Sequence, residues 1–159
     1  MPFTNSSENG SDVSINSSIE ESVASSSIEE NGSVGLAYTL NGDNTYWVSS
    51  FGDCQDSEII IPSTYQGKAV TGIAKEAFAY TETIASVYIP ASVKKIQANA
   101  FLLCMNLEKV TFETTVGWTT RTSDLLIDGE TVDVADSMQA ATLLTTTYVN
   151  YYWVLEFGV

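Results

Sequence analysis

The chain has 159 residues, of which 44% are hydrophobic and 16% charged, and its formal net charge is −14. The phosphates of nucleic acids and the anionic surface of a membrane repel such a protein, so we expect neither as a partner. Histidine is absent, which removes the commonest general base and the commonest metal ligand. Two cysteines, Cys54 and Cys104, are too few for a structural zinc site, and the sequence leaves open whether they pair. The composition therefore predicts no enzymatic activity, no cofactor and no metal site.

Residues 1–34 are rich in Ser and Asn and contain six acidic residues and no basic one. Low hydrophobicity with charge of one sign is typical of segments that are disordered when isolated. Two hypotheses fit this composition. The segment is either a solvated leader or linker, or an anchor that orders against a partner or against copies of itself, for example in a homotrimer. No signal peptide and no membrane-spanning stretch is visible, so we expect no membrane insertion.

The next elements are predicted to be β-strands. Residues 36–48 alternate between apolar and polar side chains on both sides of a turn cluster, Asn41–Asn44, which is typical of a β-hairpin. A short β-branched strand follows at residues 59–61 and ends at Pro62.

Two segments in the middle of the chain repeat one pattern. A shift of 23 residues superposes Val70 on Val93, Phe78 on Phe101 and Val87 on Val110. A period in the twenties is typical of solenoids, in which each coil buries its apolar side against the next coil. We therefore expect Phe78 and Phe101 in the core. The segment 59–62, IIIP, fits as an earlier copy of the strand VYIP, displaced by 28 residues.

These residues carry a resemblance to a known family. The stretch VTGIAKEAFAYTETIASVYIPASV, with the preceding YTLNGDNTYWV and IIIPSTYQGKAVTGI, resembles the BspA-type leucine-rich repeat over roughly residues 36–112. Such repeats often place Cys where Cys104 stands. The resemblance implies a non-enzymatic binding or surface protein, because family members of this kind occur in host-associated bacteria, some protists and phages.

Residues 113–159 leave the period. Asp128-Gly129 between apolar flanks predicts a two-residue hairpin turn, and Ser137 is expected to cap a short helix, MQAATLL. The stretch AATLLTTTYVNYYW resembles the segment that closes many bacterial members of the family. A solenoid end needs such a cover for its apolar coil.

The tryptophans and their aromatic neighbours divide between the core and the surface. We expect Trp118 and Trp153 inside the protein, and alternation along the strands then places Trp47 and Tyr152 outside.

The predicted fold is mainly β with short helical turns. It is a short leucine-rich-repeat solenoid of about two and a half coils, with an N-terminal β-hairpin cap and a C-terminal cap. Residues 1–34 form the leader or anchor, and residues 35–159 form a single domain. Within that domain we assign the hairpin cap and first strand to 35–62, the repeats to 63–112 and the C-terminal cap to 113–159.

The candidate site lies on the outward face of the repeat strands. Val87 and Ile89 alternate with Tyr88, so Tyr88 points outward when its neighbours point into the core. The register of the repeats places other side chains in the same face, which the resemblance marks as the usual recognition face. The candidate ligand-binding residues are Tyr88, Thr111, Ile60, Ser86 and Lys109.

The sequence supports two hypotheses of function. The first is a non-enzymatic interaction module, displayed on a surface, that binds a protein or a glycan through this face. The alternative is an accessory protein that decorates the head or tail of a phage virion, attached through residues 1–34. Either hypothesis places the protein outside the cell, on a cell surface or on a virion.

Overall fold

The computed structural model describes residues 32–126 and 129–156. The described chain is mainly β, with one short α-helix. The expectations for the leader fall almost entirely on residues 1–31, which lie outside the described residues.

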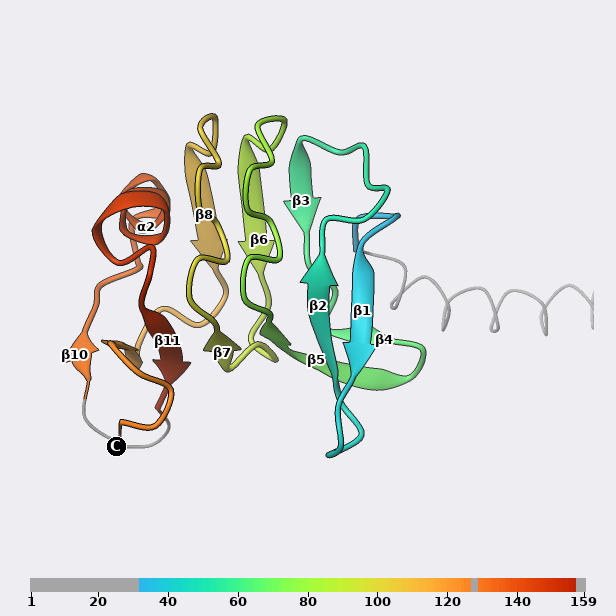
Figure 1. Ribbon diagram of the computed structural model, residues 1–159, viewed down its shortest axis with the longest axis horizontal. Helices are drawn as coiled ribbons and strands as arrows, with labels where there is room; N and C mark the ends of the chain where they lie inside the picture. The colour runs from blue at the N-terminus through green and yellow to red at the C-terminus, as the bar shows by residue number, and fades with distance from the viewer. Residues whose placement is uncertain (1–31, 127–128, 157–159) are drawn as a thin grey trace, which may run out of the picture.

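A three-stranded parallel sheet carries the repeat strands, β3 (Glu58–Ile60), β6 (Ser86–Ile89) and β8 (Lys109–Phe112). Ile59 pairs with Val87, and Val87 pairs with Val110. These pairs reproduce the shifts of 28 and 23 residues, so the expected strand register is confirmed. Figure 1 shows the three strands side by side, pointing in one direction.

A second, eight-stranded sheet lies beside the first, in the order β1-β2-β5-β7-β11-β9-β10, with β4 paired to β5. The strands β2, β5 and β7 pair in parallel, and the other pairs are antiparallel. The chain advances from the hairpin β1–β2 at one end of the molecule to β11 and α2 at the other (Figure 1). The bounds of the strands are β1 (Ala37–Leu40), β2 (Tyr46–Ser50), β4 (Thr64–Tyr65), β5 (Lys68–Ile73), β7 (Lys95–Ile96), β9 (Trp118–Arg121), β10 (Glu130–Thr131) and β11 (Tyr152–Leu155).

The core lies between these elements. Val48, Ile73, Ile96 and Trp153 are paired in register across the larger sheet, and all four are at most 1% exposed. The prediction that Phe78, Phe101, Trp118 and Trp153 are buried is confirmed, since none is more than 1% exposed.

The repeated sequence produces a repeated backbone. Glu76 and Asn99, which are equivalent under the shift of 23, have φ angles of 58° and 62°. Tyr80 and Leu103, also equivalent, have φ angles of 64° and 57°. Hydrogen bonds join the two loops in register, for example from Phe78 N to Ala100 O at 2.8 Å. Large side chains rarely adopt this left-handed conformation, so its recurrence indicates that the same packing requirement acts in both repeats.

The predicted N-terminal hairpin is confirmed. The strands β1 and β2 are antiparallel, with Leu40 opposite Tyr46, and the turn lies between them. The carboxylate of Asp43 accepts hydrogen bonds from the backbone N–H of Thr45 at 3.1 Å and from its hydroxyl at 2.6 Å. Such contacts are the usual way in which Asp stabilises a turn.

Two local predictions for the C-terminal segment are wrong. The helix α2 (Ser137–Thr142) is capped by Asp136, whose carboxylate accepts from the N–H groups of Met138 and Gln139, so Ser137 is its first residue. It continues into a π-helical turn, Leu143–Thr147.

The two-residue hairpin predicted at Asp128-Gly129 is also wrong. Residues 127–128 lie outside the described residues, but β10 pairs with β9, so the connection is much longer than two residues. Pairing with β9 gives the short strand β10 a place at the sheet edge.

Candidate binding face

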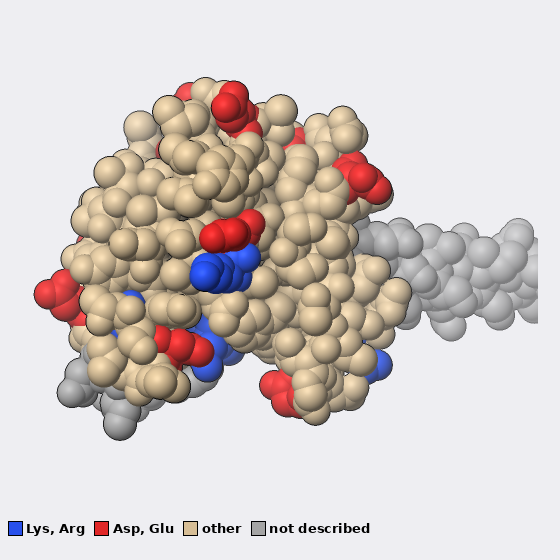
Figure 2. Space-filling view, in the orientation of Figure 1, with Lys and Arg blue, Asp and Glu red and all other residues tan. Residues whose placement is uncertain are grey.

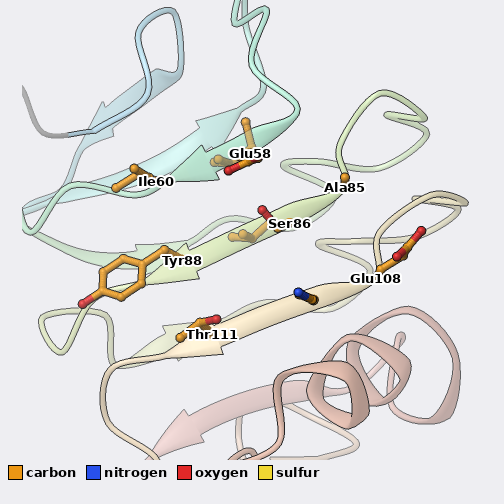
Figure 3. Close-up of a pocket in the computed structure, with 10 residues that line it drawn as sticks. Glu58, Ile60, Ala85, Ser86, Tyr88, Glu108 and Thr111 are labelled. Carbon is orange, nitrogen blue, oxygen red and sulfur yellow. The ribbon is translucent and has the colours of Figure 1, made fainter.

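The structure brings the five predicted binding residues together. Ile60, Tyr88 and Thr111 occupy paired positions on β3, β6 and β8, and Ser86 pairs with Lys109 in the next row. In Figure 3, Ile60, Tyr88 and Thr111 lie side by side on the three neighbouring strands. Their arrangement follows from the sequence, because buried Val87 and Ile89 fix the inward face of β6 and leave Tyr88 on the other face.

These side chains line a shallow hollow of about 460 Å³. Sequence reasoning missed two of its charged neighbours as site residues. Glu58 pairs with Ser86, so the strand register could have identified it. Glu108 directly precedes β8, and its N–H bonds to Ala85 O at 2.9 Å, which places it at the end of the hollow. The lining residues are Glu58, Ile59, Ile60, Ala85, Ser86, Val87, Tyr88, Glu108, Lys109 and Thr111.

Tyr88 is the largest side chain in the middle row. Partial burial, and then the negative charge and hydrogen bonding of Glu113, raise the pKa of the Tyr88 hydroxyl above its ordinary value. The hydroxyl therefore stays protonated at neutral pH and can donate or accept a hydrogen bond. Glu113 is itself held in place, since its carboxylate accepts from the N–H of Ala91 at 2.8 Å.

The hollow holds two carboxylates, Glu58 and Glu108, and one ammonium group, Lys109. No basic surface is formed there, although residues 62–112 contain five basic and three acidic side chains. In the view of Figure 2, the basic side chains likewise lie in small separate groups, some directly beside Asp or Glu. Mixed charge of this kind suits a partner that presents both signs or hydrogen-bonding groups.

The free edge of this sheet is protected by the chain itself. The N–H of Ser33 donates to Ile60 O at 2.8 Å, and its hydroxyl accepts from Ile60 N at 2.9 Å. Pro62 follows the strand and has no N–H group to leave unpaired at the edge. Natural sheets use such features to prevent edge-to-edge association, so the outward face rather than the edge is the accessible part of this sheet.

The expectation that Trp47 and Tyr152 are exposed is wrong, because both are only partly accessible. Trp47 packs on Gly72 of the neighbouring strand, which sequence alternation alone does not reveal.

The two cysteines are both buried and are not joined to each other. The thiol of Cys104 donates to Phe78 O at 3.0 Å. Burial raises the pKa of this thiol to about 11, although a backbone hydrogen bond from Thr81 acts in the opposite direction. Cys104 is therefore a packed structural residue and a poor nucleophile.

Across residues 32–126 and 129–156, no group of three or more Cys, Asp or Glu side chains is placed to hold a metal ion. The same part of the chain contains no helix that is long and apolar enough to cross a membrane.

Comparison with known proteins gives matches of two kinds. Residues 47–122 match the sequence profile described as "BspA type Leucine rich repeat region (6 copies)". No curated protein matches the chain.

Three solved structures are similar over about half of this chain. A leucine-rich repeat protein of Treponema pallidum (TpLRR) is 24% identical, with a TM-score of 0.46, over 48% of this chain and 36% of its own. One from Bacteroides capillosus is 26% identical, with a TM-score of 0.45, over 49% and 61%. A leucine-rich cell surface protein of Faecalibacterium prausnitzii is 29% identical, with a TM-score of 0.46, over 53% and 23%. The chain thus spans less than two thirds of each of these proteins.

The family resemblance expected from the repeated sequence is confirmed by the profile match. Residues 47–122 are a BspA-type leucine-rich repeat region.

Proposed function

We propose that this chain is a non-enzymatic interaction module that binds a protein partner through the outward face of β3, β6 and β8. The observation that carries this proposal is the convergence of side chains from three strands, distant in sequence, on one hollow centred on Tyr88. Tyrosine is enriched among residues that dominate binding energy, because it combines a large apolar ring with a polar tip.

The composition of the hollow favours a protein over a glycan as its ligand. Glu58, Glu108 and Lys109 offer charges of both signs around the ring of Tyr88. A peptide can pair with both signs and also bury an apolar side chain against Tyr88 and Ile60.

We further propose that the repeats form a short solenoid whose ends are covered by the hairpin β1–β2 and by the segment after residue 112. Two observations support this arrangement. The same strand register recurs from β3 to β6 and from β6 to β8. The last repeat strand, β8, is packed against α2. In this proposal residues 35–159 act as one domain, and residues 1–34 attach it to a cell surface or a virion.

Selection of binders from a displayed random-peptide library tests the binding face. Peptides selected on the immobilised wild-type protein are then measured against a Tyr88→Lys/Thr111→Lys double variant. The control is Thr39→Lys, which adds a charge at an exposed position of the other sheet. We expect affinity for the double variant to fall about tenfold or more, and affinity for the control to be unchanged.

The selected peptides would contradict the proposal if they bound all three proteins alike. Thermal melts of each variant show whether it remains folded, so that a loss of binding can be assigned to the face itself.

A further inference from the structure

Trp47 lies on the outward face of the larger sheet. Its neighbour Val48 is fully buried, so alternation along β2 turns Trp47 away from the core. Thr39 on β1 and Gly72 on β5 are its partners in register, and Gly72 pairs in turn with Lys95 on β7. These four positions form a row across the sheet, in which the side chains of Thr39 and Lys95 are exposed.

The indole of Trp47 lies against the backbone of Gly72. A methyl group added at Gly72 would stand 2.5 Å from Cε2, 2.7 Å from Cδ2 and 2.8 Å from Nε1 of the indole. Such similar distances to three atoms indicate that the ring presents its face to Gly72. Gly72 does not have the left-handed φ that favours glycine, so its lack of a side chain serves to make room for this ring.

The orientation of the indole is fixed by a chain of hydrogen bonds. The pairing of β2 with β5 skips Thr71, which is the extra residue of a β-bulge. The indole Nε1 donates to the Thr71 hydroxyl at 3.2 Å, and this hydroxyl donates to Thr45 Oγ1 at 3.0 Å. The Thr45 hydroxyl donates to Asp43 at 2.6 Å, and this hydrogen bond holds the pKa of Asp43 below its ordinary value. Bulges commonly re-aim a side chain in this way.

We propose that Trp47 is the platform of a carbohydrate-binding site, on which a pyranose ring of a glycan stacks. One face of the indole is covered by Gly72, which leaves the opposite face for a ligand. A pyranose ring offers a flat face of C–H groups to the electron-rich face of an aromatic ring, and hydroxyl groups around its rim. Thr39 and Lys95 supply hydrogen-bonding groups in the same row for that rim.

The surroundings of Trp47 favour a glycan over a protein partner at this position. The neighbours in the row are a hydroxyl, a glycine and an ammonium group, and no second large apolar side chain lies beside the indole in the row. A protein contact of this size would need further apolar surface to form a dry centre. The glycan needs one flat aromatic face that is already held in its binding orientation, which lowers the entropy lost on binding.

Tryptophan fluorescence of the full-length protein gives a direct measurement. Trp118 and Trp153 are each 1% exposed, so a ligand in solution reports mainly on Trp47. The protein is titrated with cellohexaose, chitohexaose, maltohexaose, mannohexaose and a hyaluronan hexasaccharide. We expect a saturable change with at least one of these sugars, and the absence of any response by fluorescence and by calorimetry would overturn the proposal.

Calorimetry with the responding sugar then tests the residues. We expect Trp47→Ala to weaken binding by about tenfold or more and Trp47→Tyr to retain it within a few fold. Lys95→Ala, at an exposed position, is expected to weaken binding several fold without affecting the fold. Tyr88→Lys, on the other sheet, is the control and should leave sugar binding unchanged.

The site is assigned wrongly if affinity survives Trp47→Ala, or if Lys95→Ala and Trp47→Tyr have the same effect as Tyr88→Lys. Because Trp47→Ala could fail to fold, its melting temperature is measured, and the Lys95→Ala and Trp47→Tyr results decide the question in that event. Peptide binding at this surface without sugar binding also counts against a glycan site.

Discussion

The ring of Phe101 stacks on the ring of Phe78, with centroids 5.2 Å apart and planes 7° from parallel. The two residues occupy the same position in successive repeats, and neither is exposed. Phe51 continues this row, with its ring edge-on to Phe78 at 6.4 Å. The aromatic row therefore runs along the direction in which the repeats stack and joins the hairpin end of the molecule to the repeat core.

Replacing Phe101 by Ala should destabilise the protein by about 3–5 kcal/mol, because a fully buried ring is lost and a cavity remains. Urea unfolding followed by circular dichroism measures the change. Leu103→Ala is the matched control, since Leu103 is two residues away and 46% exposed, and it should cost less than about 1 kcal/mol. Equal effects of the two substitutions would mean that the assigned repeat register is wrong.

The strand register of the repeats was predictable because the core imposes it. Each repeat places β-branched residues at alternate positions, and only one shift brings Ile59, Val87 and Val110 into line. Once that row faces inward, Tyr88 and its neighbours must face outward. The candidate binding face could therefore be identified from sequence, including residues as far apart as Ile60 and Thr111.

The environment of Trp47 could not be predicted in this way. It depends on a bulge at Thr71 and on contact with Gly72, which belong to a strand more than twenty residues later in the chain. A period or an alternation describes regular strands and does not contain bulges. The helix cap was missed for a different reason, because Asp136 and Ser137 are adjacent and both are good capping residues, so composition alone does not choose between them.

Gly72→Ala should destabilise the protein by about 1–3 kcal/mol, since the new methyl group would collide with the indole of Trp47. The indole must then leave its seat, so acrylamide should quench the tryptophan fluorescence of the variant more strongly than that of the wild type. Gly42→Ala is a suitable control, because no atom lies within 4 Å of a methyl group at that position. Unchanged quenching in Gly72→Ala would contradict the packing of Trp47 on Gly72.

Asp136→Ala should cost about 1 kcal/mol, because two N–H groups at the start of α2 lose their acceptor. Ser137→Ala is the informative comparison and should change stability by less than about 0.5 kcal/mol, since Ser137 is the first helical residue and not the cap. Thermal unfolding of the two variants distinguishes the positions. A larger loss for Ser137→Ala would move the start of the helix by one residue.

Alkaline pH should destabilise the protein through Cys104. Its pKa rises from an ordinary value of 9.0 to about 11 in the folded state, so the unfolded thiol ionises first as pH increases. The folded state then binds more protons than the unfolded state, and the free energy of unfolding falls between pH 9 and pH 11 by about 1–2 kcal/mol. This contribution is fully present below pH 9. Urea unfolding at pH 8 and pH 10.5 should show a smaller loss in Cys104→Ala than in the wild type, and parallel losses would exclude the thiol as the cause.

Removal of residues 1–31 tests whether the acidic leader mediates association. The shortened chain begins at Gly32, so that it retains Ser33 and its two hydrogen bonds to Ile60. We expect light scattering after size exclusion to give a larger mass per particle for the full chain, as a trimer would, and a monomer for the shortened chain. A monomer in both cases would identify the leader as a linker. The difference should persist at high salt if apolar side chains drive the association, because salt screens the repulsion between the acidic leaders and leaves apolar contacts intact.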